Sequence, residues 1–170
     1  MKALSKIVLL VIAMFLITGT AFTQVTASAT ATATILTPIA ISKTVDMNFG
    51  NLAVNNTPGT IVLTPASART ATGGVTFLPA NPGTITAASF TVTGLAGATY
   101  SITLPATPTI ISNAGNDLTV DTWTSNPTPT GTLTGGTSTL NVGATLNVPA
   151  SSPFGVYTSA TPFNVTVNYN

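Results

Sequence analysis

Three aspartates are the only acidic side chains in this chain of 170 residues, and they limit the chemistry that it can perform. Asp117 and Asp121 are four positions apart and could serve as paired glycosidase carboxylates or as ligands for a hard cation. Alternatively, they are two solvated acids on a strand, since positions 117 and 121 share parity and therefore one face. Asp46 is far from both in the sequence. We favour the solvated pair.

The residue types most often used in catalysis are missing from the chain. It has no His, no Cys and no Glu. Zinc sites and most nucleophile–base pairs need His or Cys. No Gly-rich loop carries a Lys that could hold a phosphate. The sequence therefore predicts a protein that is not an enzyme, with no catalytic residue, no metal and no cofactor.

Trp123 is the only Trp and is the candidate ligand contact. Its indole ring could provide a flat surface on which a sugar stacks. A single Trp at the end of a strand more often packs in the core or at its rim, and we prefer that interpretation.

The first 23 residues have the pattern of a signal peptide. Lys2 and Lys6 give it a positive start, and residues 7–17 form an apolar run that is short for a membrane span. Small residues follow, so cleavage is possible between 21 and 29, and we expect it near Thr23. The sequence predicts a protein exported through the periplasm to the cell surface or the medium. No membrane span is expected after the signal peptide is removed.

The remaining chain carries little charge. Lys43 and Arg69 stand against the three aspartates, which gives a net charge of −1, and only 4% of all residues are charged. There is no basic patch, so nucleic acid is not an expected partner. Low charge lowers solubility. An extracellular subunit that packs against copies of itself tolerates this better than a free monomer.

Alternation with a period of two predicts a strand at each end of the mature chain. At the C-terminus the apolar positions are Phe163, Val165, Val167 and Tyr169. At the start the apolar positions are Val25, Ala27, Ala29, Ala31, Ala33 and Ile35. Thr, Ser and Asn occupy the positions between them. A chain that begins and ends on strands has two edges to pair, within one molecule or between molecules.

Between these ends the sequence predicts short strands and turns, and no segment has a helical apolar period. Clusters of Gly, Pro and Asn are turn signals, at 56–59, 72–74, 81–83, 95–97, 113–115 and 134–136. The expected strands are 39–42, 47–52, 60–64, 75–78, 88–93, 99–104, 118–123, 138–142 and 144–148. This spacing predicts one all-β domain over residues 37–170, an antiparallel sandwich or barrel.

Three segments of the chain resemble the spore coat protein U-like and archaic chaperone–usher pilin group, and a related bacterial family of exported Thr-rich domains. The first is 31–39, which leads to Phe49-Gly50, and the second is 140–146. The third is 154–157 together with the alternating C-terminal strand. The similarity spans nearly all of the mature chain and rests on the order and spacing of these motifs.

The resemblance implies an immunoglobulin-like β-sandwich that lacks its last strand. In such pilins a periplasmic chaperone fills the open groove first, and the N-terminal arm of the next subunit then replaces it. Here residues 24–36 become the donor arm, with the six apolar residues from Val25 to Ile35 facing the neighbour. Phe163 to Tyr169 line the acceptor groove and its edge strand. The implied partners are copies of this chain in a head-to-tail polymer, the chaperone and an outer-membrane usher.

Three functions follow from these observations. The first is a structural subunit of a surface fibre or coat, assembled by donor-strand exchange. The second is a self-complemented secreted sandwich that binds glycans or surfaces through Trp123. The third is a weakly specific glycan hydrolase that uses Asp117 and Asp121. For the first, the Ala-rich arm buries little apolar area unless the core that receives it is bulky.

Overall fold

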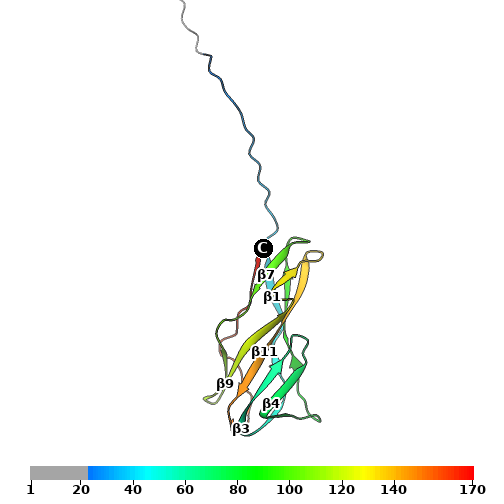
Figure 1. Ribbon diagram of the computed structural model, residues 1–170, viewed down its shortest axis with the longest axis vertical. Helices are drawn as coiled ribbons and strands as arrows, with labels where there is room; N and C mark the ends of the chain where they lie inside the picture. The colour runs from blue at the N-terminus through cyan, green and yellow to red at the C-terminus, as the bar shows by residue number, and fades with distance from the viewer. Residues whose placement is uncertain (1–22) are drawn as a thin grey trace, which may run out of the picture. The chain divides into compact units, whose positions relative to one another are not determined.

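The computed structural model describes residues 23–170 (Figure 1). The predicted signal peptide, residues 1–23, lies outside this range except for its last residue. The described chain divides into an N-terminal segment that ends at Ile35 and a domain from Leu36 to Asn170. The domain is all β with antiparallel pairing throughout, and its curled sheets form a β-sandwich, as the sequence predicts.

Twelve strands occur in residues 23–170. They are β1 (Ala40–Val45), β2 (Asn48–Phe49), β3 (Leu52–Leu63), β4 (Arg69–Phe77), β5 (Ile85–Thr86), β6 (Ala88–Thr93), β7 (Thr99–Thr103), β8 (Thr109–Asn113), β9 (Asn116–Asn126), β10 (Thr130–Thr132), β11 (Thr137–Val148) and β12 (Thr166–Tyr169).

The long strand β11 is the centre of the larger sheet. Residues 137–142 of β11 pair with β6, and residues 144–148 pair with β3. β9 pairs along the other side of β11 and carries β8. β1 and β4 complete the order β1-β6-β11-β3-β4, while β10, β7 and β12 form a second sheet in that order. β2 and β5 make a separate two-stranded pair.

Two clusters of buried side chains fill the domain. The first cluster gathers on β3, β4, β9 and the second half of β11: Ile61, Val75, Leu118, Val120, Ala144, Leu146 and Val148. The second cluster joins β6 and the first half of β11 to the three-stranded sheet: Ala88, Val92, Tyr100, Leu133, Leu140, Val142 and Val167. Met47 and Trp123 pack against both clusters and connect them.

Two of the predicted turns, 56–59 and 72–74, are wrong, because both segments lie inside the paired strands β3 and β4. The register between these strands shifts between Val54 and Gly59, and the extra residues form a bulge in β3. Gly73 has a φ of +68°, and a Cβ on Gly74 would lie 2.0 Å from the carbonyl oxygen of Thr57. The turn-forming residues therefore build a bulge and its close backbone approach.

Residues 23–39 form no strand, although the alternation predicts one over 25–35. Val25 is 91% exposed and Ile35 is 97% exposed. A strand needs a hydrogen-bonded ladder to a neighbour, and this segment forms none with any of the residues 23–170. The strand prediction is therefore wrong for the isolated chain.

Candidate strand-acceptor edge

β12 is an edge strand. In the part of the chain that the structure describes, it pairs with β7 alone, from Thr166 opposite Thr103 to Tyr169 opposite Tyr100. The sequence pattern predicts a strand from Phe163, so the ladder is three residues shorter than expected. Its partner β7 ends at Thr103, two residues before Pro105, which has no N–H to donate.

The predicted alternation of the C-terminal residues is confirmed by side-chain burial. Val167 is only 7% exposed, and the other three apolar residues, Phe163, Val165 and Tyr169, are half-buried. The Asn and Thr residues between them are exposed. All four apolar side chains pack on the second cluster, so one face of the C-terminal segment lies against the core, as expected.

The main-chain N–H and C=O groups of β12 point alternately toward β7 and away from it. The amide of Asn170 donates to the carbonyl of Thr99 over 3.3 Å. This bond shows which residues of β12 direct their main-chain groups toward β7. In an antiparallel ladder these residues alternate with residues that face away. The N–H and C=O groups of Val167 and Tyr169 therefore point to the open side of β12. An added strand would find unpaired donors and acceptors there.

The core behind β12 is bulky. The rings of Trp123 and Phe163 lie with centroids 4.4 Å apart at an interplanar angle of 40°. Tyr100 is fully buried, and its hydroxyl donates to Ser138 Oγ over 2.9 Å. The Nε1 of Trp123 is buried without a hydrogen-bond partner among the described residues. Trp123 thus packs between the two clusters, which is the interpretation that we prefer over a sugar platform.

The start of the domain lies beside the end of β12. The hydroxyl of Tyr169 donates to the carbonyl of Thr37 over 2.8 Å, and the amide of Leu95 donates to the same hydroxyl over 2.6 Å. The C-terminus lies at the end of the domain where β7 and β1 are labelled (Figure 1).

β1 is a second edge strand on the same cluster. It pairs with β6 alone in the described residues, and Ile39 and Ile41 pack on the second cluster. Sequence analysis did not identify these two residues as part of the site. The signal that could have identified them is the alternation Ile-Ala-Ile at residues 39–41, directly before the polar half of β1.

The structure does not bring the three carboxylates together. Asp117 accepts a hydrogen bond from Ser112 over 2.5 Å, and Asp121 accepts one from Asn147 over 3.0 Å. Four residues of strand separate the two acids by about 13 Å, beyond the roughly 5–9.5 Å of paired glycosidase carboxylates. Asp46 forms an exposed ion pair away from β9. Over residues 23–170 no group of three metal-ligating side chains occurs.

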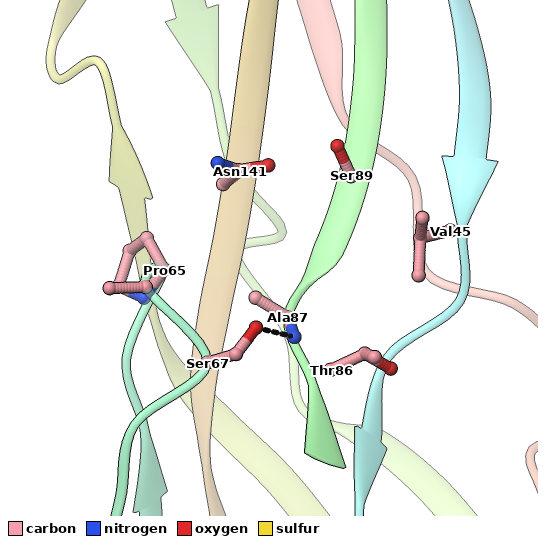
Figure 2. Close-up of a pocket in the computed structure, with 8 residues that line it drawn as sticks. Val45, Pro65, Ser67, Thr86, Ala87, Ser89 and Asn141 are labelled. Carbon is pink, nitrogen blue, oxygen red and sulfur yellow. Dashed lines mark hydrogen bonds between the residues drawn. The ribbon is translucent and has the colours of Figure 1, made fainter. Parts of the chain in front are cut away.

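A shallow hollow of about 280 Å³ lies away from β12, where β6 and β3 succeed one another along β11 (Figure 2). Ser67 Oγ accepts a hydrogen bond from the amide of Ala87 over 2.9 Å, which ties the β3–β4 turn to the start of β6. Small apolar and uncharged polar residues line the hollow: Val45, Pro65, Ala66, Ser67, Thr86, Ala87, Ser89 and Asn141. We assign it no chemistry, because no charged or aromatic side chain takes part.

The domain is an antiparallel β-sandwich, and among residues 23–170 no strand covers the outer side of its C-terminal strand, which lies next to the domain's own start. Residues 39–169 match the family described as a domain of unknown function (DUF4402), and the chain belongs to that family. No curated protein and no solved structure matches the chain. No helix long and apolar enough to cross a membrane is found in residues 23–170.

Proposed function

We propose that the protein is a structural subunit of a bacterial cell-surface fibre or coat, and that its copies join by strand addition. Residues 24–36 of one copy act as the donor arm, and β12 of another copy provides the acceptor edge. One observation carries this proposal. The side chains of Val167 and Tyr169 reach the core, while their main-chain groups face an edge that no strand covers in the described residues.

The composition of the arm suits this acceptor. Its apolar positions alternate, so one face can point into a core while the other stays in water. Four of the six apolar positions are Ala, between Val25 and Ile35 at the ends. Small side chains fit against a core that Trp123, Phe163 and Tyr100 already fill. The exposure of Val25 and Ile35 in the single chain supports the same role.

The proposal extends to the route of assembly. An unassembled subunit presents an open strand edge, which is a site for uncontrolled association. We therefore propose that a periplasmic chaperone covers β12 after export and that an outer-membrane usher orders the assembly. Copies of the chain are then the final partners, and a contact between unlike surfaces propagates along the fibre. The function needs no enzymatic activity and no cofactor.

The alternative is a self-complemented module whose arm folds back onto its own β12. The bond between Tyr169 and Thr37 favours this alternative, because it places Thr37, at the start of the domain, beside the end of β12. Deletion of residues 24–35 separates the two functions. The fibre subunit loses assembly but stays folded when the chaperone is present, whereas the self-complemented module misfolds with an exposed edge.

A gel of the mature protein, run in SDS with and without boiling, tests the proposal. Strand-joined polymers resist detergent, because removal of the arm exposes the core of the acceptor. The expected result is an unboiled ladder that collapses to one band on boiling, and no ladder from the variant without residues 24–35. A single monomer band in both lanes would contradict assembly by strand addition.

A further inference from the structure

Phe154 and Val156 are unusually exposed for apolar residues of a folded domain. Phe154 is 100% exposed and Val156 is 82% exposed, more than any other large apolar side chain from Leu36 to Asn170. Single apolar residues are common on the surface of soluble monomers, whereas larger exposed apolar patches mark interaction sites, so this neighbouring pair is a candidate for one.

Hydrogen bonds hold this pair in place. The side-chain amide of Asn113 donates to the carbonyl of Phe154 over 3.1 Å. Ser112 and Thr158 exchange two main-chain hydrogen bonds, of 2.9 and 3.2 Å. A Cβ on Gly155 would lie 2.0 Å from Asn113 Nδ2, so the segment packs tightly against the β8–β9 turn. Its apolar side chains are therefore displayed by a fixed backbone.

The pair lies at the end of the domain opposite to Tyr169. β11 spans 12 residues, which is about 40 Å of strand. At its start, Gly94 donates to Gly136, next to Leu95 and the hydroxyl of Tyr169. Near its end, β11 pairs with the part of β9 that follows the β8–β9 turn. We call the end with Thr37, Leu95 and Tyr169 the proximal end, and the end with Phe154 and Val156 the distal end.

Whether an added arm runs parallel or antiparallel to β12 determines which part of the donor copy reaches the distal end. β12 finishes at Tyr169, at the proximal end. An arm parallel to β12 also finishes there, so it closes its own sandwich or a reciprocal pair and leaves Phe154 exposed. An antiparallel arm finishes at the distal end. The 13 residues from 24 to 36 span about 43 Å when extended, which matches the length of β11.

We propose that Phe154 and Val156 form a docking surface for the proximal end of the next copy, and that the arm runs antiparallel to β12. This inference rests on the proposed function. An antiparallel arm delivers Leu36 of the donor copy to the distal end of the acceptor. Leu36 is 55% exposed and Leu95 is 36% exposed, so the donor's proximal end offers apolar side chains to cover the pair.

Substitution of the docking surface tests this inference. In the mature protein, Phe154→Ser combined with Val156→Ser should raise the concentration needed for polymers at least tenfold, with thermal unfolding of the monomer unchanged. Val62→Ser is the matched control, because Val62 is 40% exposed near the end of β3, opposite Thr145 of β11. Polymer formation by the double variant at the wild-type concentration would overturn the docking surface while leaving strand addition intact. A wild-type protein that forms no polymers would overturn both.

Cross-linking gives a second test that does not depend on stability. The chain has no Cys, so Leu36→Cys combined with Phe154→Cys creates a single pair of thiols. Head-to-tail docking predicts a covalent ladder on a non-reducing gel after mild oxidation, and no ladder from Leu36→Cys combined with Val62→Cys. Cross-linked species that stop at the dimer, or no cross-link in preformed polymers, would overturn the antiparallel arrangement.

Discussion

The hydroxyl of Tyr169 joins the last strand to the carbonyl of Thr37, across 132 positions of sequence. It also accepts the amide of Leu95. Tyr169→Phe leaves both main-chain groups without this partner, so the free energy of unfolding should fall by about 1–2 kcal/mol.

Urea denaturation of the monomeric mature protein measures this loss. Tyr157→Phe is the control, because its hydroxyl donates to the carbonyl of Pro153 in a local, exposed contact. The control should lose less than about 0.5 kcal/mol. Equal losses in the two variants would show that the bond to Thr37 has no special part in holding the domain together.

The proposed donor arm, residues 24–36, should be sensitive to charge on one face only. In the proposed assembly, Ala31→Asp puts a carboxylate on the face that would enter the core, where an unpaired charge costs several kcal/mol. Thr30→Asp puts it on the face that stays in water. Ala31→Asp should abolish the detergent-resistant ladder, and Thr30→Asp should retain it. Identical behaviour of the two variants would argue against a strand with one buried face.

Arg69 should stabilise the fold beyond its charge. Its guanidinium lies 4.2 Å from the ring centroid of Phe77 and donates to the carbonyls of Phe49 and Pro82. Lys cannot reproduce this fork of donors, so Arg69→Lys should lower the free energy of unfolding by about 1–3 kcal/mol. Lys43→Gln, which breaks an exposed ion pair, should change it by less than about 0.5 kcal/mol. Thermal unfolding compares the two, and equal shifts would refute the role of Arg69.

Gly131 should not tolerate a side chain. A Cβ at this position would lie 2.3 Å from Cζ of Tyr100, whose ring is fully buried. Gly131→Ala should therefore destabilise the domain by about 1–3 kcal/mol through overpacking. Thr132→Ala, at an exposed neighbouring position, should be nearly neutral. Denaturant midpoints for both variants decide the matter, and an unchanged midpoint for Gly131→Ala would contradict the close contact.

Local patterns in the sequence were sufficient for much of the fold. The turn predicted at 113–115 is the β8–β9 hairpin turn, and the one at 134–136 connects β10 to β11. The predicted strand 88–93 coincides with β6. These features depend on residues close together in the chain, where turn chemistry and alternation act directly.

Other features depend on contacts between distant residues and were missed. The predicted strands 138–142 and 144–148 are one strand, because Gly143 continues the ladder instead of breaking it. β10 has the sequence Thr-Gly-Thr, with no apolar pattern, and is held by its pairing with β7. β5 and β8 were also not predicted. A short strand of this kind is fixed by its neighbours rather than by its own residues.

The residues of the candidate site also divide into those that local sequence patterns predict and those that depend on distant contacts. Burial of alternate residues from Phe163 to Tyr169 could be predicted, because period two is a local property. The exposure of Phe154 and Val156 could not, since apolar residues in a sequence are first assigned to the core. Their exposure follows from hydrogen bonds to the distant Asn113 and Ser112.

The contact between Tyr169 and Thr37 also places the first and last residues of the domain next to each other. Its ends can be joined by a short linker and the chain opened at an exposed turn, which gives a circular permutant with the same strand neighbours. In such a permutant the sandwich would fold as before, but residues 24–36 would no longer lead into Thr37. Folding depends on which strands are adjacent, whereas polymer growth by the proposed strand addition would depend on where the arm is attached.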